Sequence, residues 1–147
     1  LAGTIRESLG LALAGTDELA IAKAIELESD IIVDVNDLQV QQVVISLVGN
    51  AIEAMEGCAS KELAISCARD NNRAVVRVED SGVGIPEADR PNLLEPFAAT
   101  RPNGMGVGLA IARTIIEAHG GKMWAGHKEA GTAFCFTLRL ADGPRRA

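Results

Sequence analysis

The stretch Asp80-Ser81-Gly82-Val83-Gly84-Ile85 decides the fold predicted for this sequence. It follows Ala74 to Glu79, a valine-rich run typical of a β-strand. Two glycines after a strand let the backbone pass close to a flat ligand. The Asp80 carboxylate can accept a hydrogen bond from the amine of adenine, which selects adenine over guanine. A turn or N-cap role for Asp80 is the alternative, because Asp-x-Gly-x-Gly alone is moderately specific.

A second glycine-rich stretch, Gly104-Met105-Gly106-Val107-Gly108-Leu109, opens another apolar helical run. Backbone N–H groups in such a loop, together with the N-terminal end of a helix, favour phosphate. The stretch is not a Walker loop, because no Lys-Ser or Lys-Thr follows the glycines. It also lacks the dinucleotide-binding fingerprint, whose third glycine is replaced by Leu109. Arg101 is therefore the nearest candidate for a phosphate-binding cation.

A third segment, Asp37 to Met55, carries a strong apolar stripe with helical spacing, and Asp37 is a good N-cap. Four of its residues are spaced four apart and share one helix face: Gln42, Ser46, Asn50 and Ala54. The side-chain oxygen of Asn50 can ligate magnesium while phosphates neutralise the charge of the metal. Alone, Asn50 is better explained as a half-buried structural residue. Beside the two glycine stretches it favours a magnesium nucleotide site.

The pattern along the chain predicts one α/β domain of two layers, a mixed sheet covered on one face by helices. We expect strands in antiparallel pairs over 19–28, 30–35, 63–68, 74–79, 122–127 and 132–140, and helices over 5–14, 37–55 and 107–119. Pro86 to Gly106 has little periodicity and is expected to be a long irregular, functional segment. Residues 1–14 are interpreted as a connection to another domain and 141–147 as a tail.

Composition excludes several classes of function. The 147 residues carry a formal net charge of −6, which argues against nucleic-acid binding. No apolar run approaches the ~20 residues that span a bilayer, and no signal peptide is recognisable, so we expect a cytoplasmic domain without membrane contact. Cys58, Cys67 and Cys135 are odd in number and lack metal-ligand spacing, so they are predicted to be reduced. His119 and His127 are expected to be structural or surface residues.

Taken in order, these segments resemble the catalytic ATP-binding domain of sensor histidine kinases, in the superfamily shared with gyrase, Hsp90 and MutL. The resemblance covers nearly the whole chain and rests on the N box (Gln42 to Met55), the G1 box (Asp80 to Pro86), the F box (Glu95 to Phe97), the G2 box (Gly104 to Leu109) and a closing strand (Gly131, Thr132 and Phe134). The run from Glu95 through Trp124 is most similar to PAS-linked oxygen-sensor and nitrogen-regulation kinases.

The resemblance implies the Bergerat α/β sandwich and a role for each box. Asp80 binds adenine, Asn50 holds Mg²⁺, and Thr132 supports the adenine contact through a water. The segment from Phe97 to Gly106 is the ATP lid, and Asn50, Ser46 and Arg101 form the catalytic set. The remaining implied ATP contacts are Ala54, Gly82, Gly84, Ile85, Phe97, Thr100, Gly104, Met105, Gly106, Val107, Gly108 and Leu109.

The implied activity is that of an ATP-dependent protein-histidine kinase in two-component signalling. Neither histidine lies in a phosphoacceptor-like segment, so the acceptor is expected on a separate dimerisation domain, with a response regulator as a further partner. One residue departs from the family pattern: Ser46 stands where the kinases usually have Asn and the ATPases have a catalytic Glu. Ser46 disfavours a gyrase-like or Hsp90-like ATPase. It also supports the alternative of a degenerate nucleotide-binding module without kinase activity.

Overall fold

The computed structural model describes residues 1–14, 21–28, 30–55, 61–82, 105–127 and 131–140, and at 105–108 and 126–127 it describes the backbone only. The elements are α1 (Ala2–Ala12), β1 (Ala22–Leu27), α2 (Asp37–Ala54), β2 (Glu62–Asp70), β3 (Arg73–Asp80), α3 (Met105–Ala118), β4 (Met123–His127) and β5 (Thr132–Arg139). Most of the predicted irregular segment and the predicted tail lie outside the described residues.

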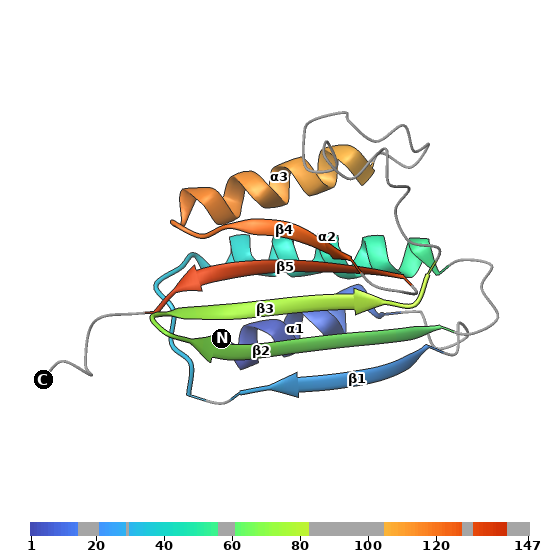
Figure 1. Ribbon diagram of the computed structural model, residues 1–147, viewed down its shortest axis with the longest axis horizontal. Coiled ribbons are helices and arrows are strands. Elements are labelled where there is room, and N and C mark those ends of the chain that lie inside the picture. The colour runs from blue at the N-terminus through green and yellow to red at the C-terminus, as the bar shows by residue number, and fades with distance from the viewer. Residues whose placement is uncertain (15–20, 29, 56–60, 83–104, 128–130, 141–147) are drawn as a thin grey trace, which may run out of the picture.

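The strands form one mixed sheet in the order β1-β2-β3-β5-β4 (Figure 1). The pairs β2/β3, β3/β5 and β4/β5 are antiparallel, whereas β1 runs parallel to β2. The expected mixed sheet is therefore confirmed, but the expected antiparallel pairing of residues 19–28 with residues 30–35 was wrong. The partner of β1 is the strand that follows α2, so α2 is the crossover helix of a βαβ unit.

The predicted strand over residues 30–35 is also wrong. This segment makes only an isolated bridge, between Val33 and Leu140. It crosses the end of the sheet between β1 and α2 (Figure 1) and buries Ile31 in the core. Its alternating apolar residues thus reflect a core-anchored connection, because the chain must return from the sheet to the helix layer at this point.

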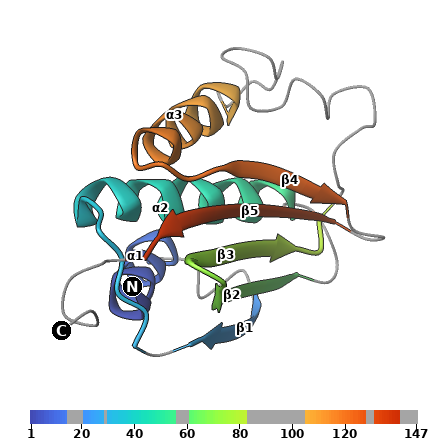
Figure 2. The ribbon, with the colours of Figure 1, turned by 60° about the vertical axis from the view of Figure 1, so that its left-hand side comes forward.

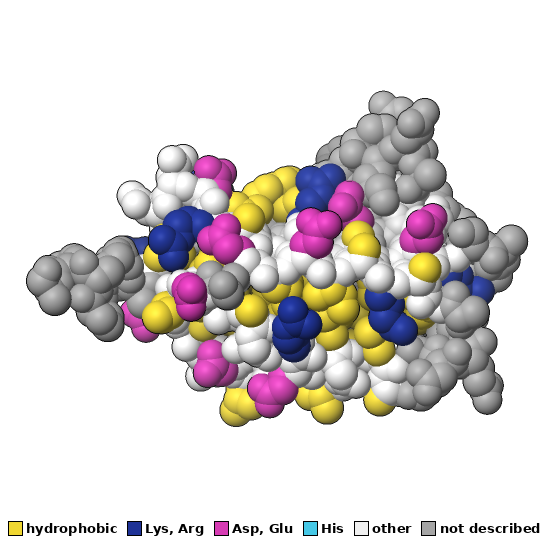
Figure 3. All heavy atoms as spheres, turned by 90° about the horizontal axis from the view of Figure 1, so that it is seen from below, with side chains coloured by type: hydrophobic (Ala, Val, Ile, Leu, Met, Phe, Trp, Pro, Cys, Tyr) yellow, Lys and Arg dark blue, Asp and Glu magenta, His cyan; other side chains and the backbone are white. Residues whose placement is uncertain are grey.

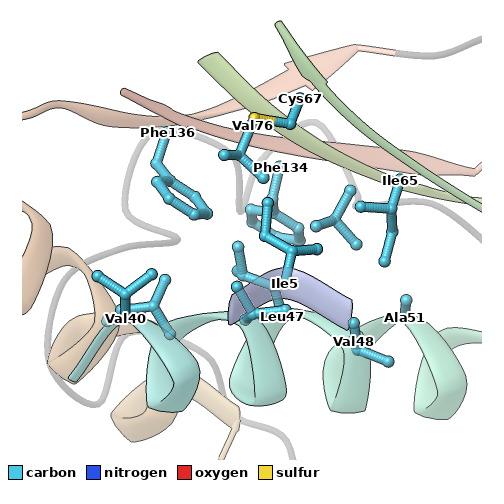
Figure 4. Packing of buried hydrophobic residues seen from close by; sticks show 14 of the residues in the cluster. Ile5, Val40, Leu47, Val48, Ala51, Ile65, Cys67, Val76, Phe134 and Phe136 are labelled. Carbon is cyan, nitrogen blue, oxygen red and sulfur yellow. The ribbon is translucent and has the colours of Figure 1, made fainter. Parts of the chain in front are cut away.

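The helices lie on one face of the sheet, as predicted. Figures 1 and 2 show α1 and α2 along this face, and α3 continues the layer beside β4 and β5. The face of the sheet toward the helices is apolar, because Val76 and Val78 of β3 stand in register with Phe136 and Phe134 of β5. Figure 4 shows these phenylalanines facing the buried stripe of α2, with Leu47 at its centre.

The helix ends differ slightly from the predicted ones. The N-cap of α2 is Asn36, whose Oδ1 accepts a hydrogen bond from Gln39 N at 3.1 Å. Asp37 is the first helical residue, where its charge favours the positive end of the helix. The C-terminal end of α3 was predicted correctly, since Gly120 has a φ of +79° and the chain turns there.

The outside of the domain carries charges of both signs. Figure 3, which looks onto the β1 side of the sheet, shows acidic and basic side chains interspersed among apolar ones. Among the described residues, no helix has the length and apolar composition needed to cross a membrane.

Candidate functional site

A buried carboxylate stands at the end of β3. Asp80 is only 2% exposed, and its register partner is Thr132, the 4% exposed first residue of β5. The Oδ1 atom of Asp80 accepts a hydrogen bond from Gly82 N at 2.8 Å, so the side chain holds the turn that follows it. A buried carboxylate is costly unless it is hydrogen-bonded. Its place at a strand end, beside a polar residue of the next strand, is suited to recognising a polar group on a ligand.

Two glycines allow the backbone to close around Asp80. A Cβ at Gly82 would overlap the carbonyl group of Ala54 at the end of α2. A Cβ at Gly131 would overlap the carbonyl oxygen of Asp80, and Gly131 has a φ of +98° that other residues rarely adopt. The turn after β3 is thus packed between the end of α2 and the start of β5.

Ser81 was not singled out from the sequence, but it fixes this turn. Its Oγ accepts a hydrogen bond from Glu62 N at 2.8 Å, and its own N donates to Glu62 O at 3.1 Å. The same Oγ lies 3.6 Å from Met55 Sδ. Ser81 therefore joins the start of β2 to the C-cap of α2, directly beside Asp80.

Asn50 is buried on the face of α2 that leads to this turn. It is 8% exposed, and its Nδ2 has no hydrogen-bond partner within the part of the chain that the structure describes. Ser46, one turn earlier, is half-buried, and Gln42 is exposed. Ala54, one turn later, contacts Gly82. The predicted helix face is therefore continuous with the Asp80 turn.

The Asn50 amide fits the predicted magnesium nucleotide. A buried polar atom without a partner costs about 1–3 kcal/mol, so it is expected where a ligand supplies the partner. The amide offers an oxygen that suits a hard cation and N–H groups that can donate to phosphate. Within the described residues, no cluster of three or more His, Cys, Asp or Glu side chains could hold a metal ion.

The second glycine stretch is more helical than predicted. The helix was expected to begin at Val107, but α3 begins at Met105, so Gly106 and Gly108 belong to its first turns. The first N–H groups of a helix have no partner within the helix, so the site retains its preference for anions. Leu109 is 1% exposed and its side chain packs in the core. Six further predicted contacts lie outside the described residues: Gly84, Ile85, Phe97, Thr100, Arg101 and Gly104.

The two described cysteines, Cys67 and Cys135, are unsuited to nucleophilic catalysis. Cys67 and Cys135 are free and buried, as predicted. Burial raises the pKa of the Cys67 thiol to about 11, and burial raises the pKa of Cys135 against the opposing effect of Arg77. Both thiols are therefore protonated near neutral pH and are poor nucleophiles. Cys58 lies outside the described residues.

Comparison with known proteins identifies the family of this chain. Residues 35–142 match the family described as histidine kinase-, DNA gyrase B-, and HSP90-like ATPase. The chain belongs to this family. The sensor protein FixL of Bradyrhizobium diazoefficiens is 39% identical to this histidine kinase-like domain over 146 residues, which is 97% of the chain and 29% of FixL. The sensor histidine kinase TmoS of Ectopseudomonas mendocina is 45% identical over 107 residues, covering 70% of the chain and 11% of TmoS.

Comparison with solved structures shows which branch of this family the chain is similar to. The catalytic domain of histidine kinase ThkA superposes with a TM-score of 0.84 at 34% identity, over 95% of this chain and 91% of that domain. ThkA in complex with the response regulator protein TrrA gives a TM-score of 0.81 at 31% identity, over 96% of this chain and 40% of that one. The chain is thus a histidine kinase catalytic domain with the predicted α/β fold, and it spans less than a third of the sensor proteins it matches.

Proposed function

We propose that this domain binds Mg-ATP and transfers the γ-phosphoryl group to a histidine on a separate dimerisation domain in the cytoplasm. A response regulator would then receive the phosphoryl group. The observation that carries the proposal is the buried Asp80 carboxylate, held at the end of β3 by Gly82 N and paired in register with Thr132. Similarity to sensor kinases, and to ThkA in complex with a response regulator protein, supports the signalling context.

Each proposed contact has a distinct role. Asp80 accepts a hydrogen bond from the adenine amine, and Thr132 supports that contact. The oxygen of Asn50 ligates Mg²⁺ while its Nδ2 donates to a phosphate oxygen, which would give this buried donor a partner. Gly106 and Gly108 line the phosphates at the start of α3, where the free N–H groups are those of the first residues of the helix, Gly106 among them.

Catalysis in this proposal is mainly positioning and charge stabilisation. The acceptor imidazole nitrogen attacks the γ-phosphorus, the bond to the β–γ bridging oxygen breaks, and ADP leaves. Bound Mg²⁺ supplies charge neutralisation for the phosphate oxygens. Asn50 orients the phosphates from α2, Arg101 adds positive charge, and the helix start at Gly106 binds the oxygens through the backbone. The nucleophile comes from the other domain.

Transfer in trans tests the function directly. The chain is mixed with the separately purified dimerisation domain of its own full-length protein and γ-labelled Mg-ATP. Acid-labile label is expected on the dimerisation domain and not on the chain. Acid-labile label on His119 or His127 would contradict the proposal. Tight ATP binding without any transfer would instead favour a nucleotide-binding module that signals without kinase activity, for which Ser46 is the supporting observation.

Ser46→Asn is expected to raise the rate of transfer with little change in stability. Ser46 shares a face of α2 with Asn50, but the serine hydroxyl reaches about one bond less far than the asparagine amide, and a water can fill the gap. The rate is measured at saturating Mg-ATP with the dimerisation domain as acceptor. Gln42→Asn, one turn earlier at an exposed position, is the control. A rate left unchanged or lowered by Ser46→Asn would show that Ser46 is fully competent.

A further inference from the structure

His119 joins the two helices that carry the proposed phosphate and magnesium contacts. It lies just beyond the last residue of α3, and its Nε2 is 3.1 Å from the backbone nitrogen of Asn36, the N-cap of α2. Its Nδ1 lies 2.8 Å from the carbonyl oxygen of Ile115, one turn back in α3. The contact with Ile115 orients the ring, and the contact with Asn36 connects α3 to α2.

The donors and acceptors fix the protonation state of this ring. The Asn36 N–H can only donate, so Nε2 must be an unprotonated acceptor. The Ile115 carbonyl can only accept, so Nδ1 must carry the hydrogen. The bridge therefore requires neutral histidine in its Nδ1–H form. An imidazolium has hydrogens on both nitrogens and would place Nε2–H against the Asn36 N–H.

The C-terminal end of α3 is anchored on the sheet as well. A Cβ at Gly121 would overlap the carbonyl oxygen of Thr137, so the turn after α3 packs directly on β5. Lys122 N donates to Thr137 Oγ1 at 3.0 Å, and Thr137 N donates to Lys122 O at 2.9 Å. The helix is thus fixed to α2 and to β5 at the end opposite Gly106 and Gly108.

Because α3 is long, a small change of angle at its anchored C-terminal end would displace its N-terminal end at the proposed phosphate site. Fourteen residues span about 21 Å, so a tilt of about 5° about the anchor moves the first turn by about 2 Å. A displacement of about 1 Å is enough to damage a positioned reaction. Leu109, Ala112 and Ile116 hold α3 in the core, but apolar contacts are non-directional. The hydrogen bond from Asn36 N to His119 Nε2 is directional and ties the end of α3 to the start of α2.

We propose that neutral His119 is a positioning residue that holds α3 in register with α2 through Asn36, so that the start of α3 faces Asn50 at the distance the phosphates need. This inference rests on the proposed nucleotide site. Charged groups on the surrounding elements are Asp37 on α2, Glu117 and Arg113 on α3, Lys122 before β4 and Arg139 on β5. Acidification protonates imidazoles and would release the bridge.

The tautomer is tested first, without nucleotide. Nitrogen-15 NMR of the histidine ring is expected to show a protonated Nδ1 and an unprotonated Nε2 at pH 8. Protonated Nε2 in the neutral ring would overturn the proposal. This measurement does not depend on ATP, so it decides the bridge even if the unmodified protein binds no ATP, a result that would overturn the proposed function instead.

ATP affinity tests the positioning role. His119→Phe keeps an aromatic ring and removes both hydrogen bonds of the imidazole. It is expected to weaken ATP binding about three- to tenfold, the factor for the one net hydrogen bond that joins α3 to Asn36. His119→Gln can still present an acceptor to Asn36 and is expected to retain most of the affinity. Both are measured by calorimetry on protein whose fold is verified by thermal melting. Unchanged affinity in His119→Phe would overturn the proposal.

The dependence of ATP affinity on pH distinguishes a positioning role of His119 from a packing role. This test remains decisive if His119→Phe fails to fold. At a pH low enough to protonate imidazoles, the unmodified protein is expected to lose more ATP affinity than His119→Gln, because only histidine loses its acceptor on protonation. Because ATP itself titrates equally in both experiments, comparing the two proteins removes its contribution to the pH dependence. His127→Gln, which removes the other histidine, is expected to follow the unmodified protein. Identical profiles for the unmodified protein and His119→Gln would overturn the proposal.

Discussion

Asp80→Asn is expected to weaken ATP binding about tenfold or more while the domain stays folded. The amide oxygen of Asn can still accept from Gly82 N, as Oδ1 of Asp80 does at 2.8 Å, so the turn is preserved. The other position becomes an NH₂ donor, which opposes the amine of adenine. A hydrogen bond to a charged group contributes about 1.5–3 kcal/mol, and 1.4 kcal/mol is a factor of ten. Calorimetric titration with Mg-ATP measures the change.

Glu79→Gln is the matched control for Asp80→Asn. It makes the same chemical change one residue earlier, on the opposite face of β3, where Glu79 Oε1 lies 3.2 Å from Arg77 Nε. The Glu79 side chain is 27% exposed, so loss of this ion pair is expected to leave ATP affinity unchanged. Equal ATP affinity in Asp80→Asn and the unmodified protein would refute the adenine assignment.

Asn50→Ala is expected to reduce phosphoryl transfer at least a hundredfold, the loss typical when one preorganised electrostatic contact to a reacting phosphate is removed. ATP affinity should also lose its dependence on magnesium. Thermal stability is expected to change little, because the buried Nδ2 has no partner among the described residues and its removal ends an unfavourable burial. The stability gained by removing this unpaired group offsets the stability lost when the packing contacts of the side chain are removed.

The combination of lost activity and retained stability distinguishes a ligand contact from a structural asparagine. A structural Asn50 would give the opposite pair of results, a large loss of stability with normal transfer by the folded fraction. Gln42→Ala, on the same face of α2 but exposed, serves as the control and is expected to leave both properties unchanged. Full transfer activity in Asn50→Ala would remove Asn50 from the catalytic set.

Local patterns predicted those elements whose periodicity is set by burial on one face. The stripe of α2, the β2/β3 hairpin at Asn71 and the stop of α3 at Gly120 were predicted because each depends on neighbouring residues. The parallel pairing of β1 with β2 was not predicted, because α2 separates the two strands in the sequence. Residues 30–35 look strand-like since a connection that buries Ile31 must also be partly apolar.

The residue types at the candidate site could be predicted from the sequence, but the hydrogen bonds that hold those residues in place could not. Asp80, Thr132 and Asn50 are polar residues in apolar runs, and the structure buries all three. Ser81 carries no distinctive pattern, and its pairing with Glu62 becomes visible only when β2 and β3 lie side by side. The hydrogen bond from Asn36 to His119 joins residues 83 positions apart, a separation beyond any local rule.

The first helix and strand belong to the folded domain although they lie before the residues that match the family model. The match to the family model begins at residue 35, yet Ile5 and Leu9 of α1 lie in the core and β1 pairs with the edge of β2. A polypeptide starting at residue 35 would present β2 as a bare sheet edge, which is a template for pairing with other chains. The proposed nucleotide contacts all lie within residues 35–142, whereas protection of the β2 edge from such pairing is expected to depend on the residues before them.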